Sequence, residues 1–190
     1  YKVSTGDLLR EEINKKNKLG NKIKSIIDKG LLAPDNIINK LIDNILLNKN
    51  FNNRILFDGY PRNLDQVKNL ESLLKKNNQK ISAVISLNID KESIFKRILG
   101  RQTCSNCGLI FNEYFYPSTN QNHNCGMKFL VKRSDDNDKT ILKRIETYLA
   151  KTLPILDYYK KLSLLHDING KAEIDQIFKE ISSILASLEG

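Results

Sequence analysis

The chain has 190 residues, of which 40% are hydrophobic and 28% charged, with a formal net charge of +9. This length predicts about one domain, and the composition excludes a disordered chain. Its apolar runs are too short for a transmembrane span, it begins without a secretory signal pattern, and three cysteines are an odd count for a disulfide scaffold. We therefore predict a cytoplasmic protein that contacts no membrane.

The first quarter of the chain has the pattern of consecutive helices. Ser4 and Thr5 followed by Asp7 are a start signal for a helix, because a side-chain oxygen there accepts from the first free N–H groups. Apolar residues then recur at helical spacing, and Gly30 stands where a helix ends. The predicted helices are one that begins at Ser4, one over residues 19–29 and one over 35–47.

Strands alternate with helices in the rest of the chain. The predicted strands cover residues 54–57, 81–87 and 162–168. The predicted helices cover 63–76, 90–99, 136–159 with an interruption at Pro154, and 172–188. This alternation predicts an α/β fold, a three-layer parallel sheet with helices on both faces. Residues 102–132 break the alternation and contain all three cysteines, so we expect a small inserted subdomain there.

The segment Asp58-Gly59-Tyr60-Pro61-Arg62 follows a predicted buried strand. Ligands of open parallel sheets bind beyond the carboxyl ends of the strands, so an acidic and a basic side chain at this position indicate a phosphate and metal site. A tight turn that carries two surface charges explains the same residues. The pattern alone favours the functional interpretation only slightly.

Arginine is more informative than lysine in this sequence. Lysine is spread along the whole chain, whereas there are only seven arginines, and these are expected where a rigid bidentate fork is needed. Arg97 and Arg101 lie four residues apart before the insertion, Arg133 lies at its end, and Arg144 lies on the next helix. Such a cluster would neutralise phosphate oxygens during phosphoryl transfer, although each arginine alone is explained as helix-surface charge.

Cys104 and Cys107 form a C-x-x-C pair followed by Gly108, the pattern of a zinc knuckle. Cys125 is a third ligand of the same type, and His123 is the nearest candidate for a fourth. Three such ligands favour structural Zn²⁺ over chance thiols, and the pair does not open a helix as a redox motif would. A solvated loop histidine remains an alternative for His123.

The chain resembles the bacterial adenylate kinases with a long, zinc-type lid. The resemblance covers essentially the whole chain and implies a P-loop nucleoside monophosphate kinase fold. Six of the seven arginines fall on family positions. The matching segments are STGDLLR (4–10), LLAPD (31–35), FDGYPRNLDQ (57–66), KRILGRQTCSNCGLIFNEYF (96–115), KRSDD (132–136), ILKRIETYLAKTLPILDYY (141–159) and HDINGK (166–171).

The resemblance implies a reversible phosphoryl transfer from ATP to AMP that gives two ADP, with Mg²⁺, in a monomer that serves adenine nucleotide homeostasis. It implies a core of residues 1–101 with AMP-binding helices at about 4–33, a lid insertion over 102–132 and a second core segment over 133–190. The implied AMP-binding residues are Thr5, Arg10, Leu31, Leu32, Ala33, Gly59, Tyr60, Pro61, Arg62, Gln66, Arg133 and Arg144. The implied ATP-binding residues are Arg97, Arg101, Ile110, Phe111 and Ala172.

Further roles follow from the same resemblance. Gln66 would read the adenine edge of AMP, and Asp58 would orient the waters of Mg²⁺. The implied catalytic residues are Arg62, Arg97, Arg101, Arg133, Arg144 and Asp58. The implied zinc ligands are Cys104, Cys107 and Cys125, with His123 as the fourth.

One family feature has no counterpart in the sequence. The family begins with a strand and a G-x-x-G-x-G-K phosphate loop, and these 190 residues contain no such segment. We therefore expect them to be an incomplete piece of the protein that folds poorly and catalyses weakly in isolation, since the lost strand would be central in the sheet. Purification of a cooperative, active monomer would contradict that expectation.

Two alternatives stay open at this stage. Another nucleoside monophosphate kinase is one, although Thr5, Gln66 and the cysteine-bearing insertion favour AMP; competition between phosphate acceptors distinguishes them. The other is a basic zinc-ribbon module that binds nucleic acid. Residues 108–126 contain aromatic residues but neither lysine nor arginine, which counts against it, and salt-dependent oligonucleotide binding would support it.

Overall fold

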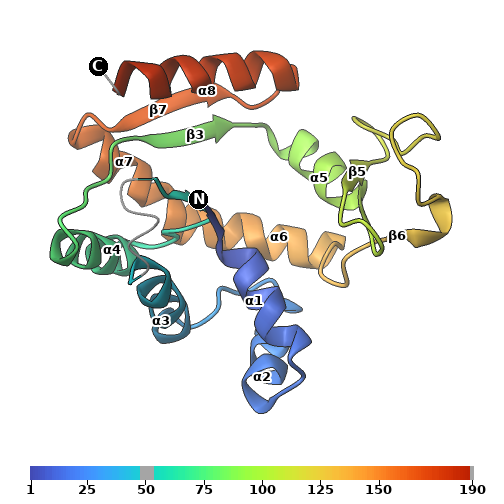
Figure 1. Ribbon diagram of the computed structural model, residues 1–190, viewed down its shortest axis with the longest axis horizontal. Coiled ribbons are helices and arrows are strands. Elements are labelled where there is room, and N and C mark those ends of the chain that lie inside the picture. Colours follow the sequence, from blue (N-terminus) through green and yellow to red (C-terminus); the bar gives the residue numbers. More distant parts are fainter. Residues whose placement is uncertain (48–53, 189–190) are drawn as a thin grey trace.

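Within residues 1–47 and 54–188, which the computed structural model describes, four strands run parallel in two separate pairs (Figure 1). The first pair is β1 (Lys2–Ser4) with β2 (Leu56–Asp58), and the second is β3 (Val84–Asn88) with β7 (Leu165–Asn169). The predicted α/β class is confirmed. The parallel sheet that we expected as one unit is present as two pieces.

The first pair belongs to a helical region that shares one hydrophobic core. Its helices are α1 (Thr5–Asn14), α2 (Lys18–Ile27), α3 (Asp35–Leu46) and α4 (Leu64–Lys76). Ser4 begins α1 by accepting a hydrogen bond from the Asp7 N–H at 3.3 Å. The core contains buried apolar side chains from β1 and from all four helices: Val3, Leu9, Ile23, Ile38, Ile42, Leu46, Leu70 and Leu74.

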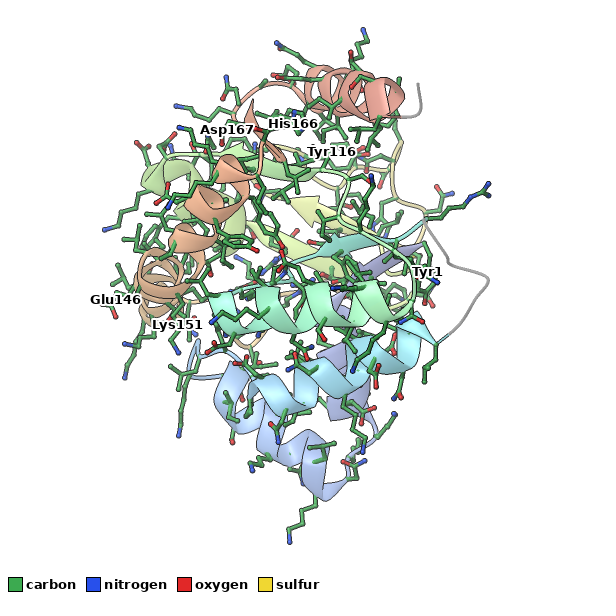
Figure 2. The ribbon with its side chains drawn as sticks, turned by 90° about the vertical axis from the view of Figure 1, so that its left-hand side faces the viewer. Tyr1, Tyr116, Glu146, Lys151, His166 and Asp167 are labelled. Carbon is green, nitrogen blue, oxygen red and sulfur yellow. The ribbon has the colours of Figure 1, made fainter. Side chains whose placement is uncertain are left out.

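The second pair lies between helices (Figure 1), with α8 (Ile174–Leu188) on one side and α7 (Leu153–Lys161) on the other. The helix α6 (Asp138–Thr147) runs into α7 through a π-helical turn over Tyr148–Thr152. Pro154, which lacks an N–H, follows this turn and explains why the helical ladder is locally widened there. Glu146 and Lys151, on α6 and this turn, project from the outer edge of the molecule (Figure 2).

The predicted insertion is a three-stranded antiparallel sheet with the order β5-β4-β6. It follows α5 (Lys91–Leu99) and consists of β4 (Arg101–Cys104), β5 (Ile110–Asn112), a short 3₁₀ turn (Met127–Phe129) and β6 (Leu130–Val131). Phe111 is buried in it and stacks on Tyr116 with ring centroids 5.8 Å apart. The insertion therefore has a small interior of its own.

Candidate active site

A cavity of about 630 Å³ opens at the carboxyl ends of β1 and β2. It receives side chains from α1, from the loops that follow α2 and β2, from the start of β4 and from α6. Most of the site residues predicted from the sequence line it: Thr5, Arg10, Leu31, Leu32, Ala33, Asp58, Gly59, Tyr60, Pro61, Arg62, Gln66, Arg101, Ile110, Arg133 and Arg144.

The loop after β2 is held to the start of α1. The Thr5 hydroxyl, which is buried, donates to the Gly59 carbonyl at 2.9 Å, and Arg62 Nε donates to the same oxygen at 2.8 Å. Gly59 has a φ of +70°, and a Cβ there would lie 2.8 Å from Arg62 Nη2. Glycine adopts this backbone conformation without strain and leaves room for the guanidinium, and the Gly59 carbonyl holds Arg62 through its Nε.

A buried carboxylate holds two further arginines in place. Asp136, whose side chain is fully buried, accepts from Arg101 Nε at 2.9 Å and from Arg101 Nη2 at 2.5 Å, a bidentate pair. Arg144 donates to the same carboxylate at 3.5 Å and also pairs with Asp135. These contacts hold the guanidinium groups of two residues that line the cavity.

The cavity has an excess of positive charge. Burial lowers the pKa of Arg62, the neighbouring charge of Arg144 lowers it further, and Asp58 opposes the shift. Burial also lowers the pKa of Arg133, with Arg101 and Arg10 adding to the effect. Arg62 is exposed and Arg133 is half-buried, so water still reaches both groups. An anion in the cavity would relieve this mutual repulsion.

Gln66 lies at the wall of the cavity and is 2% exposed. Its side-chain oxygen accepts from the Arg62 N–H at 2.7 Å, and its Nε2 donates to Asp35 at 2.6 Å. The amide is therefore held at both ends. The carboxylate of Asp58 lies nearby at the cavity edge, 3.0 Å from the Lys2 ammonium, and both groups are exposed.

Three predicted ATP-binding residues lie outside this cavity. Arg97 donates to the Gly170 carbonyl at 2.8 Å, and its guanidinium lies 5.5 Å from the Phe115 ring centre. The Ala172 N–H donates to Asn169 at 3.2 Å in the turn after β7. Arg97 and Ala172 thus flank the carboxyl ends of β3 and β7, whereas the ring of Phe111 is in the interior of the insertion.

Sequence reasoning missed the residues that hold the arginines and the glutamine. Asp136 and Asp135 anchor Arg101 and Arg144, and Asp35 anchors Gln66. The two adjacent carboxylates of Asp135 and Asp136, which follow Arg133 after one serine, were a usable signal, because acidic residues beside an arginine cluster indicate pairing. Asp35 has no such signal, since its partner is 31 residues away.

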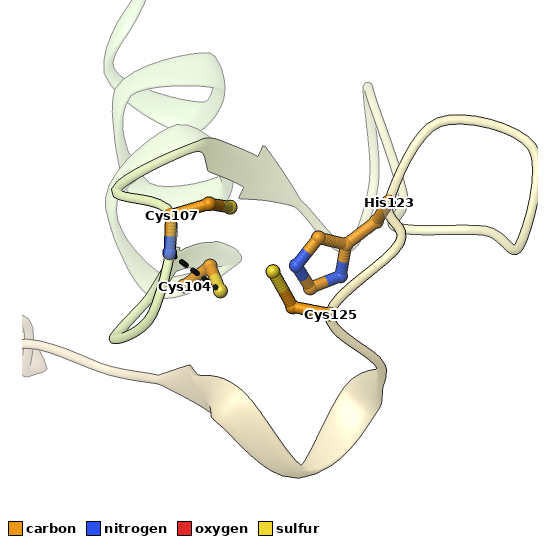
Figure 3. A group of neighbouring side chains, drawn as sticks. All are labelled: Cys104, Cys107, His123 and Cys125. Atoms are coloured by element: carbon orange, nitrogen blue, oxygen red, sulfur yellow. Dashed lines mark hydrogen bonds between the residues drawn. The ribbon is translucent and has the colours of Figure 1, made fainter.

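The predicted metal ligands come together in the insertion (Figure 3). The ligand atoms of Cys104, Cys107, His123 and Cys125 all lie within 4.8 Å of one another. His123 is buried, its Nδ1 is 2.9 Å from the Ser118 hydroxyl, and its Nε2 has no partner in the described part of the chain. Burial raises the pKa of Cys104, but N–H groups of Cys107 and Asn106 outweigh it and lower this pKa to about 6. Three sulfurs and one imidazole nitrogen fit a tetrahedral zinc site.

None of the helices within the described ranges is both long and apolar enough to cross a membrane.

An α/β fold with an arginine-lined cavity at strand ends is typical of enzymes that bind nucleotide phosphates. The adenylate kinase family model matches residues 1–164. The chain is 44% identical over 185 residues to the adenylate kinase of Pelagibacter ubique (strain HTCC1062), covering 97% of this chain and 87% of that protein. It is 37% identical over 189 residues to the adenylate kinase of Archaeoglobus fulgidus, covering 98% and 87%. The chain belongs to the adenylate kinase family, and it is therefore a phosphotransferase.

Proposed function

We propose that the chain catalyses the reversible transfer of the terminal phosphoryl group of ATP to AMP, giving two ADP. The observation that carries this proposal is the convergence of Arg10, Arg62, Arg101, Arg133 and Arg144 on one cavity beside Gln66. The names of the relatives support the same reaction. The nucleic-acid-binding alternative and other nucleoside monophosphate kinases are not favoured by these matches.

The cavity suits AMP as the acceptor. Arg10, Arg62, Arg133 and Arg144 would bind its phosphate. Leu31, Leu32, Ala33, Gly59, Tyr60 and Pro61 would surround the nucleoside. Gln66 would face the adenine edge and Thr5 would support the loop that carries Gly59. These contacts would fix the position of AMP, and positioning alone would favour in-line attack of its phosphate on the terminal phosphoryl group of ATP.

Arg97 and Arg101 would bind the ATP phosphates, while Ile110, Phe111 and the backbone of Ala172 would lie near the ATP base. The side chains would take little part in covalent chemistry, because charge neutralisation and alignment of the substrates supply most of the catalysis. Residues 102–132 would act as a lid over the core of residues 1–101 and 133–190, and its closure would exclude water from the transferring group. We further propose a cytoplasmic monomer without nucleic-acid partners.

Two metal ions fit residues of the chain. The exposed Asp58 carboxylate would orient the waters of Mg²⁺, which would supply charge neutralisation for the ATP phosphates. Structural Zn²⁺ would be held by Cys104, Cys107, Cys125 and His123, and it would cross-link the two halves of the lid. The expected result is one zinc per chain by atomic absorption, lost in Cys125→Ser. Zinc-free protein with an unchanged lid would contradict this assignment.

A coupled assay of ADP formation from ATP and AMP tests the reaction. The assay is run on the 190-residue chain and on the same chain extended by the strand and phosphate loop that the family resemblance implies. In whichever form is active, Arg62→Lys should lower kcat by about 10² to 10³, because lysine cannot replace a fixed bidentate fork. Arg54→Lys, at the exposed arginine outside the cavity, is the matched control and should have no effect. Equal losses in the two variants, or ADP formation in neither form, would contradict the proposal.

A further inference from the structure

We infer that Asp35 is a specificity-determining positioning residue. It fixes the amide of Gln66 in the one orientation that accepts adenine and rejects 6-oxopurines such as hypoxanthine and guanine. The inference rests on the proposed function, in which Gln66 faces the base of AMP.

The Gln66 amide is held by partners that cannot exchange roles. Asp35 Oδ1 accepts from Gln66 Nε2 at 2.6 Å, and a carboxylate only accepts. The Arg62 backbone N–H donates to Gln66 Oε1 at 2.7 Å, and an amide N–H only donates. Rotating the amide by 180° would place oxygen against carboxylate oxygen and N–H against N–H. The reversed amide would therefore lose two hydrogen bonds and gain two repulsions in a buried place.

Asp35 is itself fixed by the start of the next helix. The Asn63 side-chain NH₂ donates to both carboxylate oxygens of Asp35, at 3.1 and 3.2 Å. The side-chain oxygen of the same asparagine accepts from the Gln66 backbone N–H at 2.8 Å and begins α4. Asp35 in the first turn of α3 is thus joined to Asn63 and Gln66 at the start of α4 in one hydrogen-bonded ring. This ring holds the Asp35 carboxylate against the Gln66 amide.

One donor and one acceptor of Gln66 remain for a ligand. Nε2 carries two hydrogens and Oε1 two lone pairs, and one of each is used by Asp35 and Arg62. Gln66 is a lining residue of the cavity, and in this inference the remaining pair is the part of the amide that a base at the cavity wall would meet. Adenine matches this pair, because its 6-amino group donates and its N1 accepts. Hypoxanthine presents the opposite pattern, a 6-oxo acceptor and an N1–H donor, and would require the reversed amide.

Calorimetric titration of the chain with AMP and with IMP tests this inference, since IMP keeps the ribose phosphate and reverses only the 6-position and N1. In Asp35→Asn the side chain can donate as well as accept, so the carboxylate restraint on the Gln66 amide is lost while that of the Arg62 N–H remains. We expect the preference for AMP over IMP, as a ratio of dissociation constants, to fall roughly tenfold. Asp65→Asn removes an exposed carboxylate from the first turn of α4 and should leave the ratio unchanged.

Gln66→Ala supplies the second arm of the experiment. It removes the group that reads the base, so the preference for AMP should fall at least as far as in Asp35→Asn. Adding Asp35→Asn to Gln66→Ala should then change the ratio no further, which a merely structural role of Asp35 does not predict.

The outcomes separate this inference from the proposed function. If the wild-type chain binds AMP and the Asp35→Asn variant keeps the full preference for AMP over IMP, the inference alone is overturned. Equal weakening of AMP and IMP would do the same, because it would show a structural role. Wild-type chain that binds neither nucleotide would overturn the proposed AMP site and the inference together.

Discussion

The two parallel strand pairs carry the two halves of the proposed reaction, and they are built differently. At the carboxyl ends of β1 and β2, the AMP-side residues converge on one cavity and are tied to protein groups such as the buried Asp136 carboxylate and the Gly59 carbonyl. At the ends of β3 and β7, Arg97 and Ala172 lie in an open region beside α8, none of whose described residues is buried.

The comparison shows which contacts fix the positions of the arginine side chains. Arg101 and Arg144 share a fully buried carboxylate, so their orientation is set before a ligand arrives. Arg97 is held by one backbone carbonyl and by the half-exposed ring of Phe115. Ile174 and Phe178 on the neighbouring α8 are 72% and 69% exposed. We therefore expect the AMP side to be pre-organised and the ATP side to depend on further contacts.

Asp136→Asn should have the largest effect, because it acts on the pre-organisation of the AMP side. It leaves two guanidinium groups without their shared charge partner, and breaking a buried pair of this kind costs about 3 kcal/mol of unfolding free energy. AMP binding should weaken with it. Urea unfolding and calorimetry measure the two effects. Asp138→Asn, an exposed first-turn carboxylate of α6, is the control, and an equal loss there would contradict the role given to Asp136.

Gly59→Ala should have an intermediate effect. The left-handed backbone costs about 1 kcal/mol for a non-glycine residue, and the new Cβ must also displace the Arg62 guanidinium, 2.8 Å away. Gly108→Ala is a matched control, because Gly108 has a similar φ of +76° with no atom within 4 Å of the added Cβ. Both variants should lose stability by denaturant unfolding, while only Gly59→Ala should weaken AMP binding. Normal AMP affinity in Gly59→Ala would show that Arg62 is not held by this loop.

Much of this architecture was predictable from local sequence. The capping pattern at Ser4 predicted the start of α1 to within a residue, and the helix predicted over residues 90–99 begins one residue later as α5. The arginines predicted the cavity because an always-charged fork is rarely placed without a partner. The separation of the two strand pairs and the partners of Gln66 could not be predicted in this way. They depend on contacts between distant segments, such as Asp35 with Gln66, for which periodicity carries no signal. The short strand β1 was missed because three residues are too few to show alternation.

Asp90→Asn should have the smallest effect and tests the ATP side. The ion pair with Lys171, at 2.8 Å, lowers the pKa of Asp90 from its ordinary value of 3.8, and the N–H of Ser93 lowers it further. A lowered pKa in the folded state contributes stability above 3.8 that is lost as the pH falls through the folded pKa. Asparagine keeps the helix cap and removes the charge. The difference in unfolding temperature between wild type and variant should be present at neutral pH and vanish in strong acid. If the difference in unfolding temperature persists in acid, the effect of the variant comes from the helix cap and not from the ion pair.

The central claim is that the AMP side of the site is pre-organised within this chain. Calorimetric titration of the chain with AMP, without ATP, tests that claim directly. We predict one AMP per chain, with affinity strongly reduced by Arg62→Lys and unaffected by Arg54→Lys. Absence of AMP binding unless ATP is present, or equal losses in the two variants, would contradict it.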